Sequence, residues 1–450
     1  MRTQRLKPFL LLTLLGGLVT LLSACSSPTW LLANNIASTT TAQTVAMPMA
    51  STSCPLDGTA RAAVMKPIKL GSHQNVVYVY NEIPLNTSTA FPHLKRYDVV
   101  TGQKTELPVT EGLSIEHAQV SADGQWVLFV TMLDPRVDRV HAAKLQLIRM
   151  DGRELQTLYC FPVTKPSRLA PPSPINVQWS TDQKSILIDV DSNDTTSTIT
   201  LLDVATGKLH TELNIIDNTM SYGYQLLKWL DTTRAYVAKV GRSAPLPPAT
   251  LYLLDTAKNH DIHGGDLKQI LTYPQRFSFV SLDNSLDGKQ LFESDCLTVA
   301  NPFDSTISVG PATGGTRQTI YHQADTTCIT SMRVVSPSRL FMLVQYTPDQ
   351  LNTIFNQVWT LKPDGSGRVV LVNQNAKVGD GLEDWSLSPY TQFPWSNVSR
   401  DSKLYSFEAQ AFIGNTKHQT LLIGSFNGGA PKEFAFTDRG SVAIVGWTTM

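Results

Sequence analysis

The sequence predicts an all-β fold in which a unit of four short strands is repeated. Apolar runs of four to seven residues alternate with polar turns, several of which contain an Asp-Gly pair. The position before the first turn of each unit recurs at residues 121, 180, 230, 285, 336 and 399, which are 50 to 63 residues apart. No window shows a sustained helical period. A repeat of this length suits the four-stranded blade of a β-propeller.

The clearest copy of the unit begins at residues 118–130, which read Ala-Gln-Val-Ser-Ala-Asp-Gly-Gln-Trp-Val-Leu-Phe-Val. Gly124 accepts a positive φ and Asp123 can cap the turn, so this segment predicts two strands joined by a hairpin. Residues 145–152 and 154–159 supply the third and fourth strands. More degenerate copies begin at residues 177, 227, 285, 334 and 399.

The two ends of the chain decide the number of blades. Residues 76–110 contain a second, a third and a fourth strand, but no clear first strand precedes them. Residues 443–448 (Ala-Ile-Val-Gly-Trp-Thr) look like the first strand at residues 176–180. We therefore predict seven blades, with the C-terminal strand over residues 441–448 completing the N-terminal blade. The alternative is an incomplete ring of six blades.

The N-terminus has the pattern of an export signal. Three basic residues precede an apolar run over residues 9–22, shorter than the about 20 residues of a membrane-spanning helix. Residues 22–25 (Leu-Ser-Ala-Cys) resemble the lipobox of bacterial lipoproteins, which implies cleavage after Ala24 and a lipid on Cys25. The alternative is an ordinary signal peptide with an unrelated cysteine. Because Ser26 follows Cys25, the resemblance implies the outer membrane of a two-membrane host, or else the outer face of the cell membrane.

Composition supports a propeller held away from a membrane by a tether. Residues 26–60 are rich in Ser, Thr and Ala and cannot bury a core. The expected organisation is a signal peptide over residues 1–24, a lipidated flexible tether over 25–60 and a propeller over 61–450. Lys+Arg and Asp+Glu number 37 each, so no basic field favours nucleic-acid binding. We expect a monomer.

Four cysteines remain once Cys25 is assigned to the lipid. An even number in an oxidising compartment predicts disulfides, and four cysteines allow three pairings. Cys296 ends the second strand of one blade and Cys328 lies in the loop before the next, so we predict a Cys296–Cys328 bridge. The remaining pair, Cys54 and Cys160, would fasten the tether to a blade.

The repeats resemble the TolB-like propeller repeats, in which a Trp-Ser-Pro-Asp-Gly turn precedes an apolar strand and a later Asp-x-x-Gly turn. The match rests on residues 121–124, 151–152, 179–182, 203–207, 285–288, 336–337 and 364–365. No blade has the full motif, and residues 336–337 lack the Asp-Gly pair. The resemblance implies the fold. It leaves open interaction platforms, peptidase gates and propeller enzymes.

The sequence contains no motif that identifies a reaction. It has no G-x-S-x-G elbow, so we expect no hydrolase nucleophile. Residues 189–194 imitate the start of a calcium loop without its Gly and Glu, and His260 and His263 lack a third metal ligand. We therefore expect no cofactor and no metal. Trp179, Trp229 and Trp447 share one register, which favours packing between blades over a stacking surface for a ligand.

Two functions fit these features. The first is a non-catalytic lipoprotein whose propeller binds a protein or a cell-envelope polymer. The second is a propeller enzyme that acts on an extracellular carbohydrate or lactone, with catalytic groups converging in the central channel. A cluster of carboxylates or histidines in the channel would favour the enzyme, whereas an apolar or mixed surface there would favour the binding module.

The lipobox is tested by replacing its cysteine. Cys25→Ala should release the protein from membranes into the soluble envelope fraction or the medium, because a chain without the lipid has no anchor. Fractionation followed by immunoblotting measures this, with Ser27→Ala as the matched control. Membrane association of Cys25→Ala equal to that of the control would contradict the lipid anchor.

Overall fold

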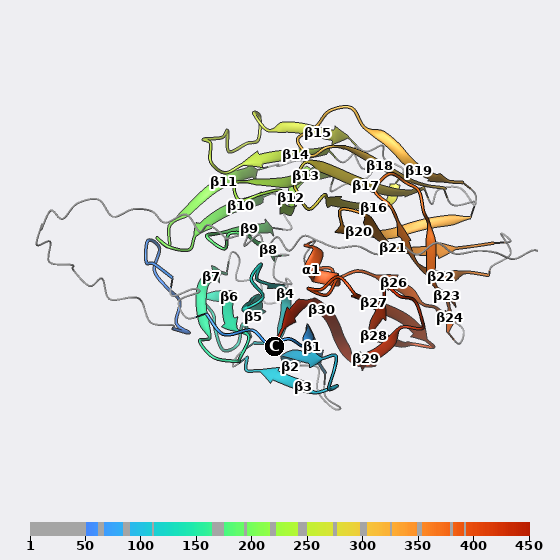
Figure 1. Ribbon diagram of the computed structural model, residues 1–450. Coiled ribbons are helices and arrows are strands. Elements are labelled where there is room, and N and C mark those ends of the chain that lie inside the picture. The colour runs from blue at the N-terminus through green and yellow to red at the C-terminus, as the bar shows by residue number, and fades with distance from the viewer. Residues whose placement is uncertain are drawn as a thin grey trace, which may run out of the picture. The chain divides into compact units, whose positions relative to one another are not determined.

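The computed structural model describes residues 51–61, 67–83, 91–109, 112–163, 175–192, 196–216, 222–241, 250–272, 277–297, 304–324, 326–348, 353–378, 381–390 and 393–450. These residues form seven antiparallel blades of four strands each, arranged in a ring (Figure 1). The predicted seven-bladed β-propeller is therefore confirmed, and the six-bladed alternative is wrong.

The blades are given from the innermost strand outwards. Blades 1 to 3 consist of β30 (Gly440–Thr449), β1 (Gln74–Glu82), β2 (Phe91–Asp98) and β3 (Lys104–Leu107); β4 (Ser114–Val120), β5 (Trp126–Met132), β6 (His141–Arg149) and β7 (Gln156–Pro162); and β8 (Ile175–Trp179), β9 (Ser185–Ser192), β10 (Thr196–Asp203) and β11 (Leu209–Ile216). Blades 4 and 5 consist of β12 (Tyr222–Trp229), β13 (Arg234–Gly241), β14 (Thr250–Asp255) and β15 (Lys268–Thr272); and β16 (Phe277–Asn284), β17 (Gln290–Leu297), β18 (Asp304–Pro311) and β19 (Gln318–Gln323). Blades 6 and 7 consist of β20 (Thr327–Ser336), β21 (Arg339–Tyr346), β22 (Phe355–Leu361) and β23 (Val369–Asn375); and β26 (Asp384–Ser386), β27 (Leu404–Ile413), β28 (Thr416–Ser425) and β29 (Lys432–Thr437).

The core lies between the blades, because both faces of each sheet pack against a neighbour. All seven residues of β5 are buried for this reason, and all of them except Thr131 are apolar. The three tryptophans in the shared register, Trp179, Trp229 and Trp447, are all buried. Their predicted role in packing is therefore confirmed. Burial of aromatic side chains of this size contributes strongly to the stability of each blade interface.

A repeated turn links the first two strands of several blades. The Ser121 hydroxyl donates to Asp123 at 2.6 Å and accepts the Trp126 N–H at 3.0 Å. Serines 180, 285 and 399 bond in the same way to an aspartate two residues later and to the N–H five residues later. The fourth turn position has positive φ even where glycine is absent, at Gln183 (62°) and Ser402 (57°). The serine and aspartate contacts thus hold a backbone shape that costs a non-glycine residue about 1–2 kcal/mol.

The C-terminal strand closes the ring. β30 pairs antiparallel with β1 from Gln74↔Thr449 to Glu82↔Gly440 and becomes the innermost strand of blade 1, as predicted. Val445 and Trp447 on this strand are fully buried, although they lie near the chain end. The Trp447 indole N–H donates to the Ser406 hydroxyl of blade 7 at 2.9 Å, so one residue joins the first and last blades.

Blade 7 departs from the regular repeat. Its innermost strand is interrupted: β26 pairs with β27, and Val398 rejoins the sheet in an isolated bridge to Tyr405. Residues 387–390 and 393–397, which we call the insert, lie outside the sheet between these points and include the short helix α1 (Pro394–Asn397). A small hairpin of β24 (Lys377–Val378) and β25 (Gly381–Leu382) precedes β26. The insert and this hairpin lengthen the repeat, which explains why the repeat positions 336 and 399 are farther apart than the others.

Part of the segment that we expected to be tether lies against the propeller. The Thr157 N–H on β7 donates to the Ser51 carbonyl at 2.7 Å, and the buried Arg61 donates through Nε to the Leu158 carbonyl at 2.7 Å. Gly58 N–H donates to the Gly207 carbonyl at 2.9 Å. Ordered contacts with blades 2 and 3 therefore begin before the expected boundary at residue 61. In the described part of the chain, no helix has the length and apolar character needed to cross a membrane.

Ring closure by β30 is tested by comparing two deletions. Deleting residues 440–450 should lower the melting temperature sharply, because loss of a buried Trp side chain alone costs about 3–5 kcal/mol out of a total stability of roughly 5–15 kcal/mol. Deleting residues 26–50 retains all the contacts described above and should change the melting temperature little. Differential scanning calorimetry measures both. Equal melting temperatures for the C-terminal deletion and the full-length protein would contradict closure by β30.

Candidate functional site

The central channel is the first place to look for a site, because the innermost strands of all blades meet there. The insert of blade 7 lies at the middle of the ring, where α1 is drawn in Figure 1. Phe393 and Trp395 stack with ring centroids 4.6 Å apart and an interplanar angle of 2°. Phe393 is buried with apolar side chains of blades 3 and 4, while Trp395 also contacts the core between blades 1 and 2. Aromatic side chains of the insert therefore fill space inside the ring.

Hydrogen bonds fix the insert to the innermost strands. The Trp395 indole N–H donates to the Val120 carbonyl of β4 at 2.9 Å. The Ser388 hydroxyl donates to the Ile444 carbonyl of β30 at 2.5 Å. Tyr390 lies beside the buried His117, with ring centroids 5.7 Å apart, and burial lowers the pKa of His117 to about 3. His117 is therefore neutral at ordinary pH and packs against the Tyr390 ring.

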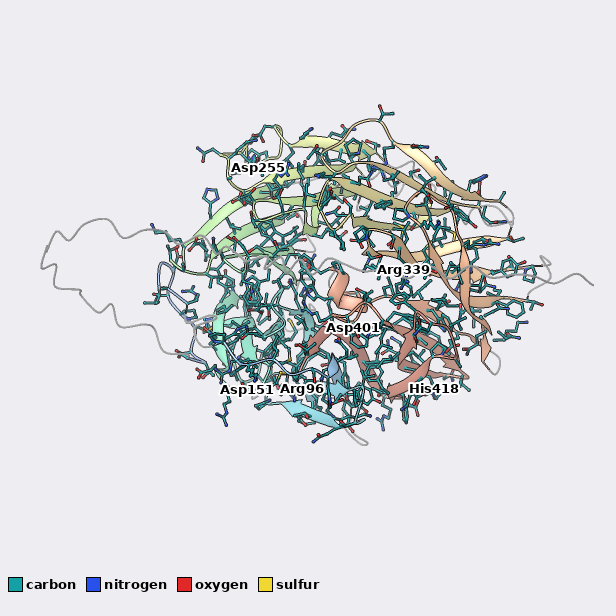
Figure 2. The ribbon with its side chains drawn as sticks, in the orientation of Figure 1. Arg96, Asp151, Asp255, Arg339, Asp401 and His418 are labelled. Atoms are coloured by element: carbon teal, nitrogen blue, oxygen red, sulfur yellow. A yellow bond between two sulfur atoms is a disulfide. The ribbon has the colours of Figure 1, made fainter. Side chains whose placement is uncertain are left out.

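Arg400, just after the insert, joins three blades. Its guanidinium donates to the carbonyls of Trp447 at 2.7 Å, Ala122 at 2.7 Å and Ser121 at 2.9 Å. Its Cζ lies 5.0 Å from the centre of the Trp395 ring. Burial lowers the pKa of Arg400 to about 10, partly offset by Asp123. Figure 2 shows Asp401, the next residue, beside α1 near the middle of the ring.

Charged groups on the innermost strands pair with one another between blades. Lys228 on β12 contacts Asp283 on β16, with Nζ and Oδ1 2.5 Å apart, and both side chains are buried. The second Asp283 oxygen accepts the Val334 N–H of β20 at 2.7 Å. Burial lowers the pKa of Lys228 and of the adjacent Arg333, while Asp283 raises both. These groups link blades 4, 5 and 6.

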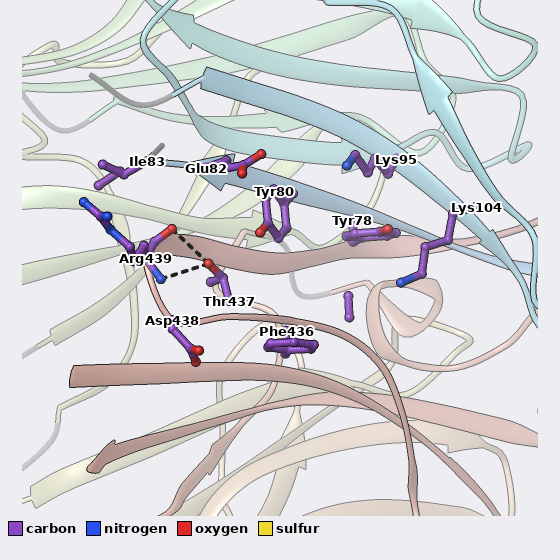
Figure 3. Close-up of a pocket in the computed structure, with 11 residues that line it drawn as sticks. Tyr78, Tyr80, Glu82, Ile83, Lys95, Lys104, Phe436, Thr437, Asp438 and Arg439 are labelled. Carbon is purple, nitrogen blue, oxygen red and sulfur yellow. Dashed lines mark hydrogen bonds between the residues drawn. The ribbon is translucent and has the colours of Figure 1, made fainter. Parts of the chain in front are cut away.

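A groove lies on the outer side of the ring, between blades 7 and 1, where the chain closes. Its volume is about 470 Å³. One wall is the face of β1 to β3 and the other is β29 with the turn that follows it (Figure 3). We call it the seam groove and define it by Tyr78, Tyr80, Lys95, Lys104, Phe436 and Arg439.

Aromatic packing forms the base of the seam groove. Phe434 on β29 is buried, stacks on Tyr97 with centroids 5.0 Å apart, and meets Tyr78 edge-on at 5.5 Å. Burial raises the pKa of Tyr78 to about 12, so its hydroxyl stays neutral. The Lys95 ammonium lies 4.9 Å from the centre of the Tyr80 ring. The seam groove thus combines aromatic rings with three cations and with the carboxylates of Glu82 and Asp438.

The structure brings both predicted cysteine pairs together. Cys54 is bonded to Cys160, with Cα atoms 5.7 Å apart, and Cys296 is bonded to Cys328, with Cα atoms 5.2 Å apart. Cys25 lies outside the described residues. His141 Nδ1 lies within 4.8 Å of the sulfurs of Cys54 and Cys160, but the disulfide already occupies both sulfurs.

The other residues that the sequence suggested as metal ligands form hydrogen bonds with protein groups. The buried Asp189 accepts the Leu226 N–H of the next blade at 2.8 Å, and residues 193–195 of that loop lie outside the described part of the chain. His260 bonds to the Asp255 carbonyl, and His263 Nδ1 lies 3.2 Å from the Asn214 carbonyl. These contacts stabilise turns and blade interfaces.

The sequence alone did not reveal the insert or the seam groove. The groove is formed by residues of β1 to β3 and by residues 435–439, which are more than 300 positions apart. Only the predicted pairing of β30 with β1 could have brought these segments together. The insert gave no signal because Phe393-Pro394-Trp395 has neither a strand nor a helix period.

The comparisons with known proteins identify the fold. No model of a known protein family matches the sequence, and no curated protein matches it. Among solved structures, the chain is similar to one from a study of two prolyl endopeptidases. The TM-score is 0.51 and the identity 13%, and the match covers 84% of this chain and 50% of that one. The chain thus spans about half the length of that protein.

Other solved neighbours have different names. TolB from Acinetobacter baumannii matches with a TM-score of 0.41 and 13% identity over 81% of each chain. The periplasmic gluconolactonase PpgL from Pseudomonas aeruginosa matches with a TM-score of 0.48 and 11% identity, covering 83% of this chain and 99% of that one. At such identities the likeness concerns the fold alone. The chain is a seven-bladed β-propeller protein, and its function has to be argued from its own residues.

Glu408 gives the channel region a testable pH dependence. Its Oε1 accepts the Ile444 N–H at 2.9 Å. Burial raises the pKa of Glu408 from 4.5 to about 8, against the opposing effects of that hydrogen bond and of Lys417. Since the folded pKa exceeds the unfolded one, the folded state binds more protons between these values. Its stabilising contribution is therefore complete below about pH 4.5 and is lost as pH rises toward 8.

Glu408→Gln keeps the acceptor oxygen and removes this titration. The variant should gain about 1–3 kcal/mol relative to the original protein between pH 4.5 and pH 8.5, because only the original must bury a charge or take up a proton when it folds. Urea unfolding at several pH values measures the difference, with the exposed Glu433→Gln as control. A constant difference between Glu408→Gln and the original protein across this pH range would show that Glu408 titrates normally.

Proposed function

We propose that the protein is a membrane-anchored, extracytoplasmic lipoprotein whose propeller is a non-catalytic binding module for a protein or a cell-envelope polymer. The observation that carries the proposal is the packing of the insert inside the ring. Phe393 and Trp395 occupy the middle of the ring, where a propeller enzyme would need room for substrate and converging catalytic groups.

The polar groups around the channel support the same view. Among the described residues, those on the innermost strands mostly bond to backbone groups of the next blade or to one another, as Lys228 and Asp283 do. Ser388 is likewise engaged with the Ile444 carbonyl. Groups committed to holding blades together are poorly placed to act as a general acid and base. An enzyme with its site in the channel is therefore the weaker candidate.

The location outside the cytoplasm rests on two supports. The basic and apolar leader with its cysteine at position 25 is typical of exported lipoproteins. The Cys54–Cys160 and Cys296–Cys328 disulfides fit an oxidising compartment. Cys54 precedes the first strand of the propeller and Cys160 lies on β7, so the first disulfide would fasten the end of the tether to blade 2.

The seam groove is the binding surface that the described residues favour. It is open to solvent and lies on the outer side of the ring. The partly buried Tyr80 ring lies in it beside the Lys95 ammonium, and Arg439 lines its far end. An aromatic side chain in a groove lined by charged residues is typical of a recognition surface.

The proposed function is tested by capture from cell-envelope extracts. Full-length protein on a support should retain an envelope component that Tyr80→Ala together with Arg439→Gln retains at least about tenfold less, a loss of roughly 1.4 kcal/mol. Phe412→Ala is the matched control, because Phe412 is 51% exposed but lies outside the groove. Mass spectrometry and glycan analysis of the retained material give the readout.

Two results would contradict the proposal. Equal retention by the groove variant and by Phe412→Ala would remove the seam groove as the binding surface. Turnover of an extracellular lactone or carbohydrate by the purified protein, reduced by Tyr390→Phe, would identify an enzyme acting at the channel.

A further inference from the structure

The two disulfides of the described chain differ in their surroundings. Cys296 and Cys328 are fully buried. Cys54 and Cys160 are only half-buried, and their bond joins the segment before the first strand to β7, the outermost strand of blade 2. A small thiol can therefore reach the Cys54–Cys160 bond while the propeller stays folded, whereas the other bond is shielded from it.

A histidine lies beside the accessible disulfide. His141 Nδ1 is 3.9 Å from the Cys54 sulfur and 3.0 Å from Asp138 Oδ2. The other Asp138 oxygen accepts the backbone N–H groups of Val140 and His141, both at 2.9 Å, which fixes the carboxylate in place. Because an ionised carboxylate can only accept, Asp138 keeps a proton on Nδ1, facing the Cys54 sulfur. An imidazolium at this position stabilises a thiolate on Cys54.

The disulfide holds the start of the N-terminal segment on the edge of β7. The Ser51 carbonyl accepts the Thr157 N–H of β7 at 2.7 Å. Farther along, the segment bonds to blade 3, where Asp57 Oδ1 accepts the Leu209 N–H at 3.2 Å. Opening the disulfide thus removes the covalent link of residues 51–54 to blade 2 and leaves the contacts with blade 3 in place.

We propose that the Cys54–Cys160 disulfide is a site of thiol–disulfide exchange, and that its opening by a dithiol reductant releases residues 51–54 from β7. A thiolate of the reductant attacks the Cys160 sulfur and forms a mixed disulfide, while Cys54 leaves with the bonding electrons as a thiolate beside His141. The second sulfur of the reductant then displaces Cys160. The reductant becomes a cyclic disulfide and gives two electrons to the protein sulfurs, and its two protons pass to Cys160 and His141.

Opening this bond changes the length of the tether, a consequence that rests on the proposed lipid anchor, whereas the exchange itself does not. The first contact of the chain with the propeller moves from residue 51 to residue 57. Six more residues between Cys25 and that contact extend the reach of the propeller by up to roughly 20 Å. The redox state of one disulfide would thereby set how far the propeller can extend from its membrane.

The exchange is tested by treating folded, full-length protein with dithiothreitol, quenching with iodoacetamide and locating the labelled cysteines by peptide mass spectrometry. Cys54 and Cys160 should be labelled at least about 100-fold faster than Cys296 and Cys328, because the buried bond is reached only when the fold opens. Equal rates for the two disulfides would overturn the proposal.

The role of His141 is tested by His141→Asn, which keeps a hydrogen-bond donor but cannot carry a charge. The variant should open about tenfold more slowly, because the leaving thiolate has lost the imidazolium. At about pH 6, where few ordinary cysteines are ionised, reduced Cys54 should also react with iodoacetamide about tenfold more slowly than in the original protein. The other charged groups near the bond stay unchanged: Lys144, opposite Cys160 on β6, and Asp57, three residues after Cys54.

His73→Asn is the matched control for His141→Asn. His73 also pairs with an aspartate, Asp98, at 2.9 Å, but it lies beside blade 1. This variant should open its Cys54–Cys160 bond at the original rate. Equal rates in His141→Asn and His73→Asn would show that His141 takes no part in the exchange.

Release of the segment is measured by hydrogen exchange at Thr157. Its amide should exchange at least about tenfold faster after dithiothreitol treatment, and also in untreated Cys54→Ser, Cys160→Ser protein. The Arg61 amide, which donates to the Val204 carbonyl of blade 3 at 3.1 Å, should exchange as before and serves as the internal control. Continued protection of Thr157 in both samples would show that the segment stays on β7, and would overturn its release.

Discussion

The whole ring depends on how the free edge of each innermost strand is satisfied. An innermost strand pairs with its blade on one side only, so peptide groups on its other side have no partner within the sheet. Each such group costs about 1–3 kcal/mol if it is buried without a hydrogen bond. The preceding blade supplies the partners. Gln119 bonds to both the N–H and the carbonyl of Trp179, at 2.8 and 3.2 Å. Similar contacts join Asn81 with Ile115, Ser197 with Tyr224, Ser281 with Met332, and the Ser388–Glu408 pair with Ile444.

These contacts explain why the centre of this propeller serves structure. Polar side chains of the inner strands bond to the edge of the next blade, and the insert packs Phe393 and Trp395 against the blades inside the ring. Arg400 then joins the insert region to blades 1 and 2 through three carbonyls. The proposed binding surface, the seam groove, lies where the last blade meets the first.

Much of this fold could be predicted from the sequence because its signals are local. Ser-x-Asp turns and short apolar strands define the repeat, and the likeness of Trp447 to Trp179 revealed the closing strand. The interrupted first strand of blade 7 could not be predicted, because the course of the insert depends on the space that the other blades leave. The seam groove was missed since its cations and rings belong to opposite ends of the chain, and only ring closure makes them neighbours.

Hydrogen exchange at the inner edges tests the role of the side-chain partners most directly. The backbone N–H groups of four inner-strand residues donate to side-chain oxygens of the preceding blade: Ile115 to Asn81, Trp179 to Gln119, Leu226 to Asp189 and Ile444 to Glu408. We expect these amides to exchange as slowly as amides bonded within β5, and Gln119→Ala to accelerate exchange at Trp179 selectively. Rapid exchange of all four amides in the unmodified protein would show that the inner edges are open, and would contradict this account.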